Sequence, residues 1–175
     1  MKTKHLIPVF MLLLLGTVSS CDLFDKVDDV SFDVTLPLDF VIDENADNPD
    51  GASYTDTQLL DATSDPDVAE YANKIKEFKV NKITYTISGA DPASVTFTNG
   101  FLKANGKNLA QASSVSLSNT AETDLTADIA GFNELASLLL ADKKETVELT
   151  GFLSKTPVAF NVKFKFYVTI TANAL

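Results

Sequence analysis

The chain has 175 residues, a formal net charge of −10 at pH 7, one cysteine and no tryptophan. Its only histidine, His5, and its only cysteine, Cys21, both lie in the first 21 residues. The rest of the chain therefore lacks imidazole and thiol groups, which excludes Ser-His-Asp and Cys-His catalysis, zinc sites with His or Cys ligands, and an intrachain disulfide.

The negative charge is concentrated in the first part of the chain. Residues 22–73 contain 15 acids and one lysine, whereas residues 74–175 contain 9 acids and 11 lysines. A region this acidic is repelled by phosphate groups, so we expect no nucleic-acid partner and no electrostatic docking on anionic lipid headgroups.

The groups that remain for catalysis are carboxylates, tyrosines, lysines and hydroxyls. Glycosidases that use a pair of carboxylates are the main enzyme class that needs nothing else. Such enzymes usually bind sugar rings with tryptophan, which this chain lacks. We therefore expect no enzymatic activity, and a carboxylate-based hydrolase is the remaining enzymatic alternative.

The N-terminus has the three parts of a secretory signal peptide. MKTKH is positively charged, LIPVFMLLLLG is apolar, and TVSSC supplies small residues before a cleavage point. The apolar run is shorter than the roughly 20 residues that cross a bilayer. These features predict a signal peptide over residues 1–20, with cleavage between Ser20 and Cys21.

Val18-Ser19-Ser20-Cys21 resembles the lipobox of bacterial lipoproteins, in which the cysteine is acylated and becomes the first residue of the mature protein. The resemblance covers about the first 25 residues. It implies that Cys21 is a lipidation site and that the membrane is a partner through its acyl chains. An ordinary secreted protein with an unmodified Cys21 is the alternative.

The acidic residues after the cysteine predict a tether over residues 21–29. Asp22, Asp25, Asp28 and Asp29 resemble the acidic segment that follows the cysteine in many surface lipoproteins of the Bacteroidetes group. In proteobacterial sorting, an aspartate directly after the cysteine implies retention in the inner membrane instead. The absence of arginine and tryptophan favours the Bacteroidetes interpretation, which places the protein in the outer membrane, facing the cell surface or the periplasm.

Alternation of apolar and polar residues predicts a long strand near each end of a single β-rich domain, residues 30–175. Residues 30–43 and 159–172 both place apolar side chains at every second position, which is typical of a strand with one buried face. Pro37 cannot donate a ladder hydrogen bond, so the first strand either lies at a sheet edge or breaks there. The apolar positions are Phe32, Val34, Leu36, Leu38, Phe40 and Ile42, and Phe160, Val162, Phe164, Phe166, Val168 and Ile170.

Residues 43–63 are polar, acidic and without clear periodicity, so we expect an acidic excursion or long loop. Residues 43–51 match the start of an EF-hand calcium loop, in which side chains with oxygen ligands stand at the first, third and fifth positions. Asn48, however, stands where an EF-hand has glycine, and Tyr54 stands where it has a bidentate glutamate. We expect no cofactor here and keep calcium as the alternative. Its candidate ligands are Asp43, Asn45, Asp47 and Asp50.

The middle of the chain predicts short elements separated by turns. Residues 64–78 predict a helix capped by Ser64, with Pro66 in its first turn. Alternation at Ile83, Tyr85 and Ile87 predicts a strand. Two Asn-Gly pairs follow, and the first, Asn99-Gly100, predicts a hairpin because both residues tolerate positive φ. Further strands are expected at 113–120 and 145–154, a helix at 131–144, and a turn at 155–157.

About seven strands and two short helices, with little sequence for parallel crossovers, predict an all-β antiparallel sandwich of the immunoglobulin or jelly-roll type. A barrel or a curved sheet that encloses a cavity is the alternative. The phenylalanine-rich strands favour a solid core. The cavity alternative would place Phe160, Phe164, Phe166 and Leu138–Leu140 around a hydrophobic ligand.

These observations predict a lipid-anchored envelope protein that acts as a non-enzymatic binding or assembly module. Its partner would be another envelope protein or an extracellular polymer. A carrier or sensor for a hydrophobic ligand is the second hypothesis, and the sequence does not specify an oligomeric state.

Overall fold

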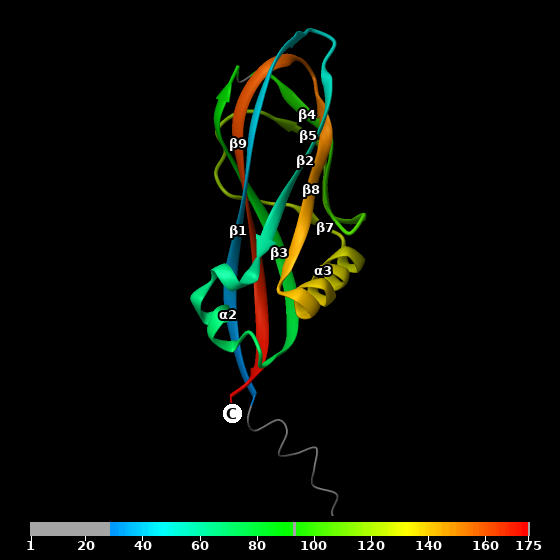
Figure 1. Ribbon diagram of the computed structural model, residues 1–175. Helices are drawn as coiled ribbons and strands as arrows, with labels where there is room; N and C mark the ends of the chain where they lie inside the picture. Colours follow the sequence, from blue (N-terminus) through cyan, green and yellow to red (C-terminus); the bar gives the residue numbers. More distant parts are fainter. Residues whose placement is uncertain (1–28, 93, 175) are drawn as a thin grey trace, which may run out of the picture.

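The two longest strands, β1 (Asp29–Asn48) and β9 (Thr156–Asn173), pair antiparallel along almost their whole length. On its other side, β9 pairs with β3 (Ile75–Asp91). The computed structural model describes residues 29–92 and 94–174. The first sheet has the order β1-β9-β3-β6, where β6 is Thr123–Asp124. Figure 1 shows β1, β9 and β3 running along the long axis of the molecule.

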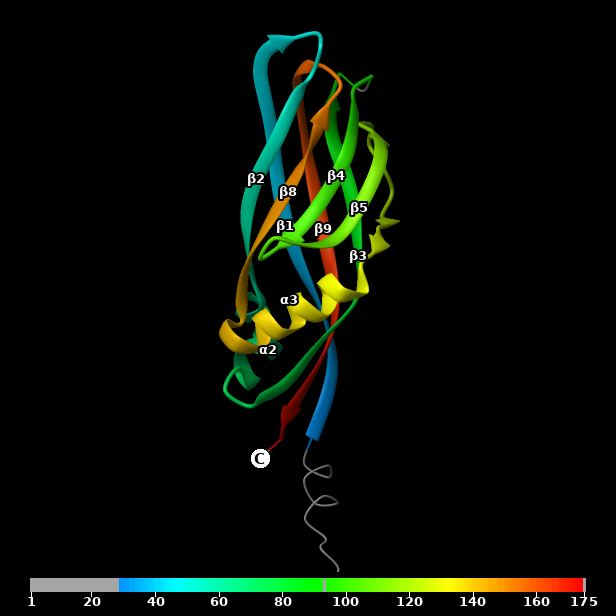
Figure 2. The same ribbon diagram turned by 90° about the vertical axis from the view of Figure 1, so that its right-hand side faces the viewer.

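The second sheet packs face to face against the first and has the order β2-β8-β4-β5-β7. Figure 2 shows the two layers and, across one end of the second sheet, the longer helix. The strands are β2 (Ala52–Asp61), β8 (Lys144–Leu153), β4 (Thr96–Ala104), β5 (Lys107–Ser116) and β7 (Thr126–Ala127).

This strand order is that of a jelly roll, because β1-β9-β3-β6 faces β2-β8-β4-β5 with antiparallel pairing throughout. The predicted all-β antiparallel sandwich is therefore confirmed. The described strands form two separate sheets and do not close into a barrel. β1 lies at the outer edge of the first sheet, as Pro37 predicts.

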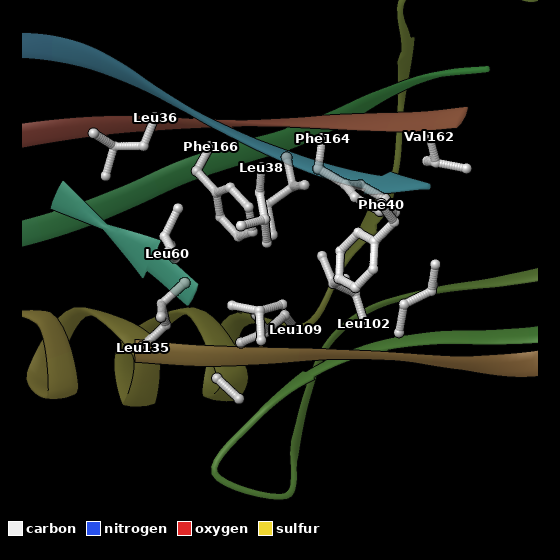
Figure 3. Close-up of a cluster of buried hydrophobic side chains, with 14 of the residues drawn as sticks. Leu36, Leu38, Phe40, Leu60, Leu102, Leu109, Leu135, Val162, Phe164 and Phe166 are labelled. Carbon is white, nitrogen blue, oxygen red and sulfur yellow. The ribbon is translucent and has the colours of Figure 1, made fainter. Parts of the chain in front are cut away.

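The apolar positions of the two alternating strands form the core. Leu36 pairs with Phe166 and Leu38 with Phe164, so their side chains point together toward the second sheet. Figure 3 shows them meeting Leu60 of β2, Leu102 of β4 and Leu109 of β5. The rings of Phe40 and Phe164 meet edge to face with centroids 5.7 Å apart.

The loop prediction for residues 43–63 is wrong. β1 continues to Asn48, and after a tight turn at residues 49–51 β2 runs from Ala52 to Asp61. The distal part of β1 keeps its backbone pairing with β9, and Glu44 lies opposite Val158. Its side chains from Asp43 onward are exposed or half-buried, so no apolar alternation marks the strand.

The helix predicted over residues 64–78 is shorter than expected. α2 spans Pro66–Tyr71, and Asp65, not Ser64, caps it by accepting from the backbone N–H groups of Asp67 and Val68. A 3₁₀ turn, η1 (Ala62–Ser64), precedes it. Phe78 belongs to β3, where it is buried opposite Ile170, so pairing with β9 overrides the local helical spacing.

The predicted Asn99-Gly100 hairpin is also wrong. Both residues lie inside β4, where the register with β8 shifts between Thr98 and Phe101. The turn between β4 and β5 is Asn105-Gly106 instead, and both of its residues have positive φ (47° and 73°). The ring of Phe97 lies over Gly100, and a Cβ there would be 3.0 Å from it. The first Asn-Gly pair is thus a bulge.

The second predicted helix is confirmed as α3 (Ile129–Asp142), with Phe132, Leu135 and Leu139 buried. Asp128 caps its N-terminus by accepting from the N–H groups of Ala130 and Gly131. Gly131 lets the helix approach β5 closely, because a Cβ at this position would lie 1.8 Å from the carbonyl oxygen of Asn108.

We expect Gly131→Ala to destabilise the domain by about 1–3 kcal/mol, because the added methyl group meets backbone atoms that cannot rotate away. Thermal unfolding followed by circular dichroism measures the change. Ser137→Ala, at an exposed position of the same helix, is the control and should change stability by less than about 0.5 kcal/mol. Equal melting temperatures for Gly131→Ala and wild type would contradict the close approach.

Candidate functional site

The segment between β5 and α3, residues 117–128, crosses from the second sheet to the first and back, and we name it the strap. It leaves β5 and bonds to β3, where the N–H of Thr120 donates to the carbonyl of Ile87 at 3.0 Å. The N–H of Leu125 donates to the carbonyl of Ile83 at 3.0 Å. The strap then returns to the second sheet as β7, which pairs with β5 at Ala110 and Gln111. It thus closes one side of the sandwich.

An apolar cleft of about 50 Å³ lies between the two sheets on the side that the strap covers. Leu125, half-buried at the centre of the strap, is one of its lining residues. No charged residue lines the cleft. The lining residues are Tyr85, Ile87, Phe97, Gly100, Phe101, Leu102, Ala110, Gln111, Ala112, Val115, Leu117, Leu125, Leu149, Phe160, Val162 and Phe164.

The structure brings together only part of the cavity predicted from the sequence. Phe160 and Phe164 line the cleft, but Phe166 and Leu138–Leu140 do not. Phe166 is fully buried deeper in the core, next to Leu38 and Leu36 (Figure 3). A pocket for a small molecule usually has about 300–1,000 Å³, so a cleft of this size fits a single side chain rather than a lipid.

A polar network on the outer face of the first sheet holds the strap in place. The carboxylate of Glu122 accepts from Thr84 Oγ1 at 2.8 Å, from Lys165 Nζ at 2.7 Å, and from the hydroxyl of Tyr167. Thr84 is 1 % exposed although its side chain is polar, and Glu122 satisfies it. Glu122 therefore joins the strap to β3 and β9 at once.

A second strap acid lies beside this network. Asp124 is 3.4 Å from Lys82 Nζ, and the same ammonium group lies 4.6 Å from the centre of the Tyr167 ring. Because both pairs are exposed to solvent, each contributes little by itself. Together they keep Leu125, which directly follows Asp124 in sequence, on the cleft side of the strap.

The hydrogen bonds from Lys165, Tyr167 and Thr84 lower the pKa of Glu122 from 4.5 to about 2. The same contact raises the pKa of Lys165. A carboxyl group that acts as a general acid needs a raised pKa, whereas Glu122 stays ionised at neutral pH. Its chemistry is that of a structural acceptor.

The four candidate calcium ligands do not form a cluster. Asp43, Asn45 and Asp47 lie along β1 with exposed side chains, and Asp50 lies in the turn after it. Alternate residues of a strand are more than 6 Å apart and project in parallel, so they cannot surround one ion. Among the residues that the structure describes, no three Asp, Glu, His or Cys side chains are close enough to hold a metal.

Cys21, Ser20 and the predicted signal peptide and tether lie outside the described residues, except for Asp29, where β1 begins. No helix in the described part of the chain is long and apolar enough to cross a membrane.

The strap, its Glu122 network and the position of the cleft could not be predicted from the sequence. The one available signal was a run without charged residues, Asn108 to Ala121, which ends at Glu122.

No protein-family model matches the chain, and no curated protein sequence matches it. It is similar to the decameric BFDV capsid protein, with 10 % identity and a TM-score of 0.47 over 81 % of this chain and 99 % of that one. It is also similar to a structure of Desmodium yellow mottle tymovirus, with 10 % identity and a TM-score of 0.39 over 83 % of this chain and 90 % of that one. Both TM-scores are below 0.5, so neither likeness carries an argument about function.

We expect Glu122→Gln to lower the melting temperature at pH 6 and to have a smaller effect as the solution becomes more acidic. The pKa of Glu122 is depressed in the folded protein, so its stabilising effect is present above the ordinary pKa of 4.5 and is lost as the pH falls toward about 2. Thermal unfolding of both proteins between pH 6 and pH 2 measures the difference.

The control is Glu77→Gln, at an exposed position of β3 that forms no ion pair with the described residues. Its unfolding curves should follow those of the wild-type protein at every pH. A Glu122→Gln protein as stable as wild type at pH 6 would show that the network does not hold the strap.

Proposed function

We propose that this protein is a lipid-anchored lipoprotein of the cell envelope whose jelly-roll domain acts as a non-enzymatic binding or assembly module. The observation that carries the proposal is Val18-Ser19-Ser20-Cys21, which follows an apolar run and precedes an acidic segment. Acyl chains on Cys21 would tether the domain to the outer membrane, since two anchoring signals suffice for stable attachment. The source would be a bacterium of the Bacteroidetes type.

The geometry of the domain supports attachment through one end. β1 begins at Asp29 and β9 ends at Asn173, and these two residues are paired, so both strand ends lie at the same pole (Figure 1). The chain from Cys21 to Asp29 can reach at most about 28 Å. The 20 residues of β1 then extend about 65 Å from that pole. An anchored domain would present the β1–β2 and β8–β9 turns farthest from the membrane.

The electrostatics support a binding module rather than an enzyme. The most strongly perturbed carboxyl group in the described residues, Glu122, has a lowered pKa and serves as an acceptor for three side chains. Catalytic carboxyl pairs need one group that is protonated near neutral pH. The partner in this proposal is another envelope protein or an extracellular polymer.

Cys21→Ser should release the protein from the membrane fraction, because the hydroxyl group cannot be acylated by the lipoprotein pathway. Detergent phase partition and the intact mass of the purified protein measure the change. Wild-type protein should enter the detergent phase with a mass increased by its acyl chains, and Cys21→Ser should stay in the aqueous phase. Retention of Cys21→Ser in the membrane would contradict the lipid anchor.

The matched control is Lys26→Ser, which makes a similar change in the same segment but keeps the cysteine. It should remain acylated and membrane-bound. If both variants leave the membrane, the segment as a whole and not the acylated cysteine is responsible.

Protease treatment of intact cells, with lysed cells as the control, distinguishes the two faces of the outer membrane. Digestion on intact cells would place the domain on the cell surface and make an extracellular polymer the partner to test. Protection until lysis would place it in the periplasm and make an envelope protein the partner to test.

A further inference from the structure

The edges of the two sheets are protected from pairing to very different degrees. A strand edge with unpaired backbone groups attracts other strands, and natural proteins block it with charged residues, proline or a covering segment. β1, the edge of the first sheet, carries Pro37 and exposed aspartates along its length. These aspartates are Asp33, Asp39, Asp43 and Asp47.

The opposite edge of the second sheet has no such protection. β7 pairs with β5 only at Ala110 and Gln111, and in the described structure residues 112–116 of β5 pair with β4 alone. The strap that leaves at Leu117 bonds to β3 instead of running along this part of β5. Residues 112–116, which we name the free edge, therefore lack a strand partner on this side. The carbonyl of Ser116 accepts from the N–H of Ser118 at 3.0 Å, so the open backbone groups are those of residues 112–115 and the N–H of Ser116.

The free edge is also uncharged. From Asn108 to Ala121 the chain contains no Asp, Glu or Lys, and Ser113, Ser114 and Ser116 are exposed. Its side chains are small, so a second backbone can approach to ladder distance. A charged segment that pairs with this edge would lose hydration of its charges and find no opposite charge there, so the edge favours a segment that is itself uncharged.

The apolar cleft lies next to the free edge. Ala112 and Val115 of the free edge line it, together with Leu117 just beyond. Side chains of a strand added to β5 would alternate between solvent and the space between the sheets. Every second side chain would then point toward the cleft, which has room for one apolar side chain and no charged residue to oppose it.

We propose that the free edge and the cleft together form a docking site for an extended, uncharged segment of a partner protein with apolar residues at alternate positions. The segment adds to the second sheet by β-strand addition: backbone hydrogen bonds to β5 provide affinity, and the apolar cleft provides specificity. The inference deepens the proposed binding function by naming the surface and the kind of partner.

The observations favour a polypeptide strand over the other occupants. The cleft is too small for a lipid, and a short alkyl chain in it would form no hydrogen bond with the open backbone groups of the free edge. In a second copy that pairs edge to edge, Ala112 and Val115 already line that copy's own cleft, and the remaining side chains, Ser113, Ser114 and Ser116, do not fill an apolar cleft. A partner strand with valine or leucine at alternate positions meets both requirements.

The experiment uses the mature chain with Cys21→Ser, which keeps every described element because β1 begins at Asp29. The probe is a fluorescein-labelled heptapeptide of alternating threonine and valine, and the control peptide has aspartate in place of each valine. Fluorescence anisotropy measures binding, and hydrogen exchange locates it. We expect saturable binding of the valine peptide alone and slower exchange in the segment that contains residues 112–116.

Two variants of the protein test the site itself. Ser114→Lys adds a charge to the free edge and should weaken binding of the valine peptide by about tenfold or more. Thr57→Lys adds the same charge at an exposed position of β2, the other edge of this sheet, and should leave binding unchanged. Both positions are exposed, so neither change should impair folding.

Three results would overturn the proposal. These are equal binding of the two peptides, no effect of Ser114→Lys, and a dimer that Ser114→Lys abolishes, which would make a second copy the occupant. Binding of decanoic acid that Ser114→Lys leaves intact, without peptide binding, would assign the cleft to an alkyl chain. Because the protein in this assay carries no lipid, its outcome is independent of whether Cys21 is acylated.

Discussion

The antiparallel pairing of β1 with β9 is the constraint on which the rest of the structure depends. These strands come from opposite ends of the domain, and their register aligns Leu36 with Phe166 and Leu38 with Phe164. A shift of one residue would turn every one of these side chains to the solvent face, so burial of the phenylalanines specifies the register. Once β9 is placed, it pairs with β3 on its other side and completes the inner wall of the core.

The jelly-roll order converts a charge pattern in the sequence into a charge pattern in space. β1 and β2 carry most of the acids of residues 22–73, and the fold places them at the edges of the two sheets on the same side of the molecule. The lysines of β9 and β3 lie on the outer face of the first sheet, where Lys163 pairs with Asp39 and Lys76 with Asp29. The side opposite the acids is closed by the strap.

The strap shows how a polar network can position an apolar residue. Glu122 receives hydrogen bonds from β3 and β9 on the outer face, and the backbone of Leu125 bonds to Ile83, so the leucine is held over the cleft. The strap covers the edge of β3 but not residues 112–116 of β5. This unequal coverage leaves one sheet edge and one apolar cleft open at the same place.

The sequence by itself determined the features that arise from local patterns. Alternation predicted β1 and β9, a helical repeat predicted α3, and Pro37 predicted either an edge strand or a break in it. The number of strands and the scarcity of crossover sequence predicted the sandwich. The lipid anchor at Cys21 stays a prediction from sequence.

Only the tertiary structure decided which strands pair, that β1 and β2 continue through the acidic residues, that Phe78 lies in a strand, and which Asn-Gly pair makes the turn. It also placed Glu122 beside Lys165, 43 residues away along the chain. The reason is physical: apolar periodicity records which face of an element is buried, but backbone pairing between distant strands leaves no mark on either strand alone.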